Sequence, residues 1–197
     1  MFFLDKGLSF FEIGLLISFR EVMVYIMEIP AGIIADVLGR RKVMIFAFVS
    51  YIISFSVFFF ANAFWLFMLS FIFYGFGDAF RQGTHKSMII DYLRLKGWKD
   101  QKTAYYGHTR SWSQIGSAVS SLIAAVIVVF TGDYQSVFIF STIPYFLNLI
   151  MMTTYPKELD GEIVRHKGSD LKENFRQVIR DLITTFKNLT VLKTVGN

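Results

Sequence analysis

The sequence has no cysteine and little charge. Without cysteine, disulfides and thiolate metal sites are excluded. Only 18% of the 197 residues are charged, whereas a soluble domain carries about 25%. Hydrophobic residues make up 54% of the chain. The charges cluster between apolar runs of about 20 residues, which is the length of a helix that crosses a bilayer. A soluble core would have shorter runs, so the composition predicts an integral membrane protein.

Motifs of enzymes and of nucleic-acid binding are also lacking. We find no phosphate-binding loop, nucleophile triad or zinc motif in the sequence. No secretory signal is evident, because the first six residues have neither a basic start nor a small-residue cleavage site. The net charge of +5 could indicate nucleic acid, but the Lys and Arg residues flank the apolar runs and are better explained as membrane anchors. We therefore expect no nucleic-acid partner, no cofactor and no metal.

Five apolar runs are long enough to be membrane helices. They are residues 13–35, 42–60, 64–90, 105–130 and 136–155. The runs predict an all-α, polytopic transmembrane bundle over residues 1–156. Residues 157–197 are mixed in charge, and apolar residues recur at helical spacing between Leu171 and Leu189. This segment predicts a cytoplasmic amphipathic helix on the membrane or the bundle; the alternative is a solvated helix that docks on nothing in particular.

The distribution of cations predicts an orientation in the membrane. The loop at residues 39–42 holds three cations, and residues 91–102 hold four cations against two acids. The turn at Asn62 has no charge and the turn at Asp133 has one acid. Cationic loops stay in the cytoplasm, so the N-terminus is expected outside and the C-terminal segment inside. We expect a multi-pass protein of the plasma (inner) membrane.

The loop after the first run carries the most specific pattern in the chain. Residues 32–42 read Gly-Ile-Ile-Ala-Asp-Val-Leu-Gly-Arg-Arg-Lys, with Gly32, Asp36, Gly39, Arg40 and Arg41 at defined spacing. This pattern resembles the loop signature of the major facilitator superfamily, which in that family joins the second and third transmembrane helices. Glycine, acid and cation positions all match. The resemblance implies a secondary transporter of small solutes.

The resemblance also implies partners. Aligned on the signature, the five runs resemble helices two to six of a twelve-helix family, followed by the central cytoplasmic linker. We therefore expect that a first helix and a C-terminal half of the same transporter are missing from this chain and are its partners. The bilayer, a small-molecule substrate and protons are the other expected partners.

Charges around the signature predict a gate. An acid near a helix C-terminus opposes the helix dipole unless cations neutralise it, and Arg40 and Arg41 are close enough to Asp36 to do so. Asp91, at the cytoplasmic end of the third run, could accept from the same arginines. In the family such a cluster latches the cytoplasmic side, and breaking it favours inward opening. The alternative is simple anchoring of the hairpin, which would not require Asp36 and both glycines.

Ionisable residues inside the runs are candidates for the transport pathway. Glu21 and Glu28 share one face of the first run, where either could carry a proton; the alternative is a fixed ion pair with Arg20, Arg81 or Arg110. Asp78 and Arg81 share a face of the third run. By resemblance that run is helix four, which lines the central cavity, so both are candidates for substrate or proton contact. The alternative is an internal salt bridge that only orders the helix.

Arg110 opens a polar face on the fourth run, although basic and aromatic residues at the start of a span are usual interfacial anchors.

Together the ionisable residues of the runs predict a proton-coupled permease, for uptake or efflux, that works by alternating access. A membrane enzyme would need a convergent nucleophile and base, or a metal set, and we find neither. A non-transporting or degenerate half-carrier stays as the alternative, because five helices alone cannot form a pseudo-symmetric cavity.

Overall fold

A computed structural model describes residues 2–160, and every regular element in that part of the chain is helical. The elements are α1 (Phe2–Asp5), α2 (Phe10–Leu38), α3 (Arg40–Phe60), α4 (Phe64–Leu95), η1 (Lys99–Gln101), α5 (Lys102–Thr131), α6 (Gln135–Thr154) and η2 (Lys157–Asp160). The predicted all-α fold is confirmed. The amphipathic helix expected between Leu171 and Leu189 lies outside the described residues.

Local sequence decides where α2 begins and ends. The Ser9 side chain accepts the amide of Glu12, and the Glu12 carboxylate accepts the amide of Ser9, which is a reciprocal capping box. The hydrogen bond from the Ser9 amide and, to a smaller extent, the one from its hydroxyl hold the pKa of the Glu12 carboxyl below its usual range. α2 ends at Leu38, and the next residue, Gly39, has a φ of +93°, which residues with a side chain rarely adopt. Because α3 begins at the next residue, the expected loop is a one-residue turn, and Gly32 and Asp36 lie inside α2.

The helices also extend beyond the apolar runs at their charged ends. α4 continues to Leu95, although its run ends at residue 90. Asp91 and Arg94 are compatible with a helix, and helical backbone hydrogen bonds do not require an apolar surrounding. The connection expected at residues 91–102 is therefore shorter and consists of a turn at Gly97 and η1.

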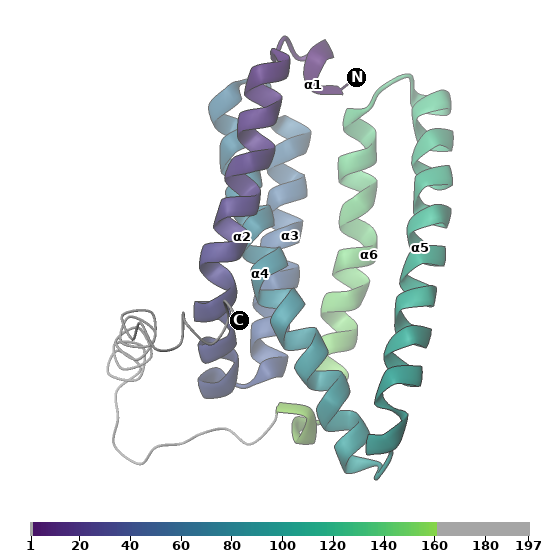
Figure 1. Cartoon of the computed structure of the whole chain (residues 1–197). Coiled ribbons are helices and arrows are strands. Elements are labelled where there is room, and N and C mark those ends of the chain that lie inside the picture. Colours follow the sequence, from purple (N-terminus) through teal and green to yellow (C-terminus); the bar gives the residue numbers. More distant parts are fainter. Residues whose placement is uncertain (1, 161–197) are drawn as a thin grey trace, which may run out of the picture. The chain divides into compact units, whose positions relative to one another are not determined.

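The helices run alongside one another, up and down in alternation (Figure 1). α3 packs against α4 and α6, and α2 packs on α4, whereas α5 makes few contacts with the other helices. The Gly39 turn, the α4–α5 connection and η2 lie at one end of the bundle, which we call the cationic end (Figure 1). The turns at residues 61–63 and 132–134 lie at the opposite end, which we call the neutral end.

Buried side chains form two clusters along the bundle. Phe2 and Phe3 of α1 pack on the cluster formed by Leu8, Leu16, Phe58, Ala61, Phe67 and Phe71. The second cluster contains Met44, Phe48, Tyr51, Met88, Met152 and Leu159, and it therefore joins α3, α4, α6 and η2. Tyr51 of this second cluster also takes part in the polar contacts described below.

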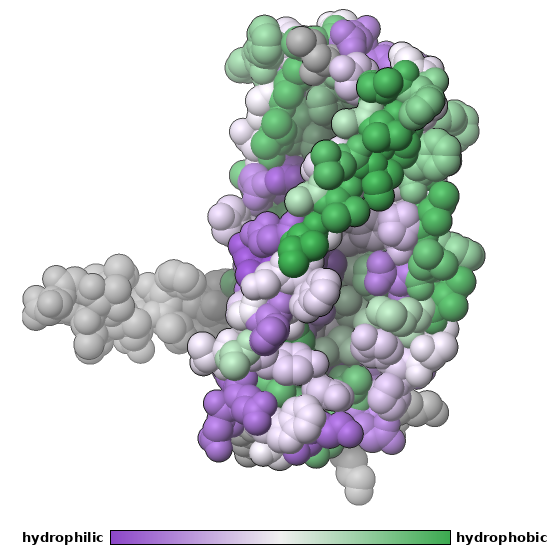
Figure 2. All heavy atoms as spheres, turned by 90° about the vertical axis from the view of Figure 1, so that its right-hand side faces the viewer, coloured by the Kyte–Doolittle hydropathy of each residue, from purple (hydrophilic) through white to green (hydrophobic). Residues whose placement is uncertain are grey.

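Three helices, α3, α5 and α6, are long and apolar enough to cross a membrane. α2 and α4 carry more ionisable residues, so their crossing stays a prediction. α5 exposes large apolar side chains, among them Val129 and Phe130, which are 81% and 86% exposed. Figure 2 faces the side of the bundle on which α5 lies, and it shows hydrophobic residues gathered over the upper part and hydrophilic residues towards the lower end. Such a surface suits contact with lipid or with another apolar helix.

Candidate functional site

Arg40 connects the start of α3 to the last turns of α4 at the cationic end. Its Nη1 forms an ion pair with Asp91 and donates to the Ser87 carbonyl at 3.3 Å. Its Nη2 lies 3.7 Å from the Asp36 carboxylate. The Arg40 and Asp91 side chains are 17% and 20% exposed, whereas Asp36 is 57% exposed. Because water screens a partly buried pair less, Asp91 is the stronger partner of Arg40.

Arg41 has different partners from those expected. Its Nη1 donates to the Tyr155 carbonyl at the end of α6, at 2.9 Å, and its backbone amide donates to the Asp160 carboxylate at 2.8 Å. Arg41 itself makes no ion pair with Asp36 within the described residues. Asp160 therefore caps the first turn of α3 and fastens η2 to the signature loop. The expectation that both arginines neutralise Asp36 is met by Arg40 alone.

The two signature glycines differ in what surrounds them. A Cβ at Gly39 would lie 3.1 Å from the Asp160 Cγ, so this position needs glycine both for its φ and for the approach of the carboxylate. A Cβ at Gly32 would meet no atom of the described residues within 4 Å. Packing among residues 2–160 thus explains Gly39 and leaves Gly32 unexplained.

Asp78 and Arg81 of α4 meet the hydroxyl of Tyr51 from α3. The Tyr51 hydroxyl donates to Asp78 Oδ1 and accepts from Arg81 Nε at 3.1 Å, while Arg81 Nη2 lies 3.3 Å from the same carboxylate oxygen. Asp78 is buried further than Arg81, with side chains 14% and 42% exposed. A Cβ at Gly77 would lie 3.1 Å from the Tyr51 ring, so this glycine allows the ring to approach α4. The Arg81 Nη1 has no hydrogen-bond partner among the residues that the structure describes.

The acids of α2 lie apart from this cluster. Glu21 forms an ion pair with its neighbour Arg20, whose guanidinium lies 5.4 Å from the centre of the Tyr74 ring. Glu28 is exposed and makes no ion pair or hydrogen bond to any residue that the structure describes. Among the partners expected for these two acids, Arg20 is the one that the structure places beside Glu21.

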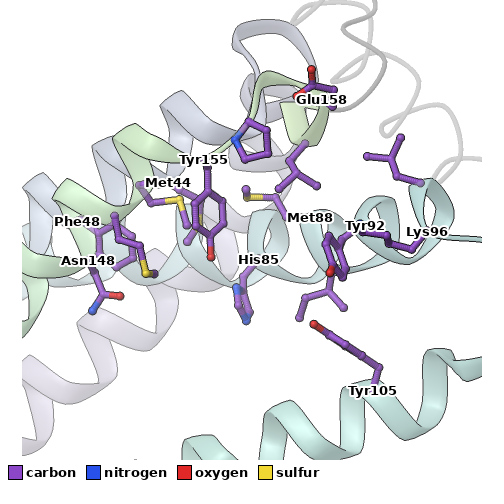
Figure 3. Close-up of a pocket in the computed structure, with 16 residues that line it drawn as sticks. Met44, Phe48, His85, Met88, Tyr92, Lys96, Tyr105, Asn148, Tyr155 and Glu158 are labelled. Atoms are coloured by element: carbon purple, nitrogen blue, oxygen red, sulfur yellow. The ribbon is translucent and has the colours of Figure 1, made fainter. Parts of the chain in front are cut away.

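A largely apolar cavity of about 780 Å³ lies near the cationic end, between α3, α4, α5, α6 and η2. Methionines and aromatic rings form most of its wall: Met44, Phe48, Met88, Tyr92, Tyr105, Met151, Met152 and Tyr155. Figure 3 shows His85 among these side chains, with Asn148 and Glu158 farther along the wall. Methionine is flexible and polarizable, so such a wall adapts to apolar groups of different shape.

A second, polar cavity of about 330 Å³ lies between α4 and α5. Its lining consists of Arg81, Gln82, His85, Lys86, Ile89, Tyr106, Thr109, Arg110 and Ser113. Two residues expected in the transport pathway, Arg81 and Arg110, are therefore brought to one cavity, and His85 lines both cavities.

Sequence patterns did not reveal Tyr51 or Asp160. Tyr51 lies in a run rich in Phe, Ile and Val, and its only signal is that a buried tyrosine hydroxyl needs a hydrogen-bond partner. Asp160 follows α6 and has no sequence spacing that relates it to Arg41, which is 119 positions away.

Comparison with known proteins agrees with the loop signature. The chain matches the family model described as Major Facilitator Superfamily over residues 2–192. No curated protein and no solved structure matches it. The match includes the signature loop, every helix from α1 to η2 and the residues of both cavities.

Proposed function

Since this chain belongs to the major facilitator superfamily, a family of membrane transporters, we propose that it moves a small solute across the membrane by alternating access. The cationic end faces the cytoplasm of the plasma (inner) membrane, because it carries the Gly39–Lys42 loop and the α4–α5 connection. The polar sides of α2, α4 and α5 close against a second helical bundle. The protein acts as a permease and not as an enzyme.

The observation that carries this proposal is the bridge made by Arg40. The Arg40–Asp91 pair is partly buried at the cationic end, and Asp36 adds a weaker contact. A transporter needs two states of similar free energy, and an ion pair that forms in one of them shifts the population towards it. We assign this pair to the state in which the cytoplasmic side is closed.

Protons are the coupling ion in this proposal, and Asp78 is their carrier. A proton on Asp78 removes the negative charge that holds Arg81 at 3.3 Å. Arg81 then becomes available to the polar cavity that it already lines. Coupling follows because proton arrival and solute binding act on the same guanidinium. Glu28, which is exposed, is a second acid through which protons enter, whereas Glu21 is held by Arg20.

The experiment uses the natural absence of cysteine. Gln114 lies on the polar face of α5, near the middle of the helix, and is exposed. A Gln114→Cys protein in right-side-out and in inside-out vesicles should react with a membrane-impermeant thiol reagent from either side. A matched Leu122→Cys protein, on an apolar part of α5, should react slowly from both sides because lipid covers it. Reaction of Gln114→Cys from one side only would contradict alternating access.

A further inference from the structure

The polar cavity between α4 and α5 gathers positive charge. Arg81, Lys86 and Arg110 line it together with His85, and no Asp or Glu belongs to its described lining. Arg81 is partly neutralised by Asp78 at 3.3 Å. Lys86 and Arg110 make no ion pair or hydrogen bond to any residue that the structure describes. The cavity therefore has more cations than residues 2–160, the described part of the chain, neutralise.

The position of these cations makes the excess of positive charge unfavourable in free energy. Arg110 lies five residues inside the predicted apolar run 105–130, or roughly 8 Å of helix from its start. A cation at such a depth is disfavoured by the low dielectric of the bilayer unless an opposite charge or water accompanies it. Because Arg110 faces a cavity shared with two further cations, an anion in that cavity would offset the cost for all three.

Neutral donors complete the wall. The Gln82 amide and the Tyr106 and Ser113 hydroxyls line the same cavity, and the structure gives them no hydrogen-bond partner among the described residues. The Thr109 hydroxyl, in contrast, already donates to the Tyr105 carbonyl at 2.9 Å. Guanidinium groups bind carboxylate or phosphate oxygens through two parallel hydrogen bonds, and ammonium and hydroxyl groups add further donors.

We propose that this cavity binds an oxyanion, a carboxylate or phosphate group, with Lys86 and Arg110 as its charged contacts. The group belongs either to the transported solute or to the headgroup of a lipid in the adjacent leaflet. In the first case the inference rests on the transport function proposed above and adds that the solute is an anion. A volume of about 330 Å³ is near the lower limit for ligand pockets, which suits a small solute.

Equilibrium dialysis of the purified protein in nonionic detergent tests the site. The probes are radiolabelled inorganic phosphate and radiolabelled succinate. Arg110→Gln and Lys86→Gln should each weaken binding about tenfold, because each removes one charge-assisted hydrogen bond. Lys102→Gln, on the same helix but outside the cavity lining, should bind as the unmodified protein does. Neither Lys86 nor Arg110 holds another element in place, so the helical circular dichroism of both variants should be unchanged.

A second arm identifies the source of the oxyanion. Thermal unfolding is compared in nanodiscs of phosphatidylcholine with and without added phosphatidylglycerol, in the absence of phosphate and succinate. Stabilisation by phosphatidylglycerol that disappears in Arg110→Gln and Lys86→Gln assigns the site to a lipid headgroup. Binding of phosphate or succinate in detergent assigns it to a free solute.

The proposal is overturned if neither probe nor phosphatidylglycerol has an effect, or if both variants behave as the unmodified protein does. Thiol labelling of Gln114→Cys requires no anion, so alternating access and the oxyanion site can fail independently of each other.

Discussion

At the residue scale, the pairing of Asp78 with Arg81 depends on a hydroxyl from another helix. The Tyr51 hydroxyl contacts both charged groups, and its ring packs against Tyr74 and Tyr145 at centroid distances of 5.2 and 4.7 Å. The spacing of Asp78 and Arg81 along one helix predicts that they can pair. It does not predict that α3 supplies the third member, because this depends on how α3 packs on α4.

Replacing Tyr51 by Phe should lower the free energy of unfolding by about 1.5–3 kcal/mol, the contribution of a buried hydrogen bond to a charged group. Thermal unfolding of the purified protein in detergent measures this change. Tyr74→Phe is the matched control, because Tyr74 lies in the same aromatic group and its hydroxyl has no hydrogen bond in the described part of the chain. Equal losses in the two variants would assign the effect to packing instead of to the Asp78–Arg81 contact.

At the scale of elements, the start of α3 is held by a segment that follows α6. The Asp160 carboxylate accepts the Arg41 amide, and the Arg41 side chain donates to the Tyr155 carbonyl. The helices themselves could be predicted from the apolar runs, and the glycine turn from the signature. The attachment of η2 to α3 could not be predicted, because nothing in the order of residues indicates that α6 ends beside α3.

Asp160→Ala should remove the cap of α3 and cost about 0.5–2 kcal/mol of stability, the usual contribution of an N-cap. Hydrogen–deuterium exchange should become faster in the first turn of α3 and stay unchanged at the neutral end. Glu158→Ala is the control in the same 3-10 turn. Glu158 is exposed and has no hydrogen bond in the described structure, so this change should leave the exchange in α3 as it is. Unaltered exchange in Asp160→Ala would show that the cap does not hold α3.

At the scale of the whole molecule, the alternation of charged and uncharged turns agrees with the arrangement of the helices. Both cationic connections lie at one end of the bundle in Figure 1, as expected for consecutive antiparallel spans. Composition and the signature were sufficient to predict this arrangement and the family. The polar cavity was not predictable as a unit, because Arg81 and Arg110 lie on different helices and meet only after folding.

The proposed transport cycle depends on the Arg40–Asp91 pair keeping the cytoplasmic side closed, and thiol labelling of one cysteine variant tests this role directly. In a Gln114→Cys background, the ratio of thiol labelling from the cytoplasmic side to labelling from the outside is compared with and without Asp91→Asn. Loss of the ion pair should raise this ratio roughly tenfold, which corresponds to about 1.4 kcal/mol. The charge exchange Arg40→Asp with Asp91→Arg should return the ratio towards its original value. An unchanged ratio in Asp91→Asn would contradict this closing role of the pair and would leave Arg40 as an anchor of the hairpin.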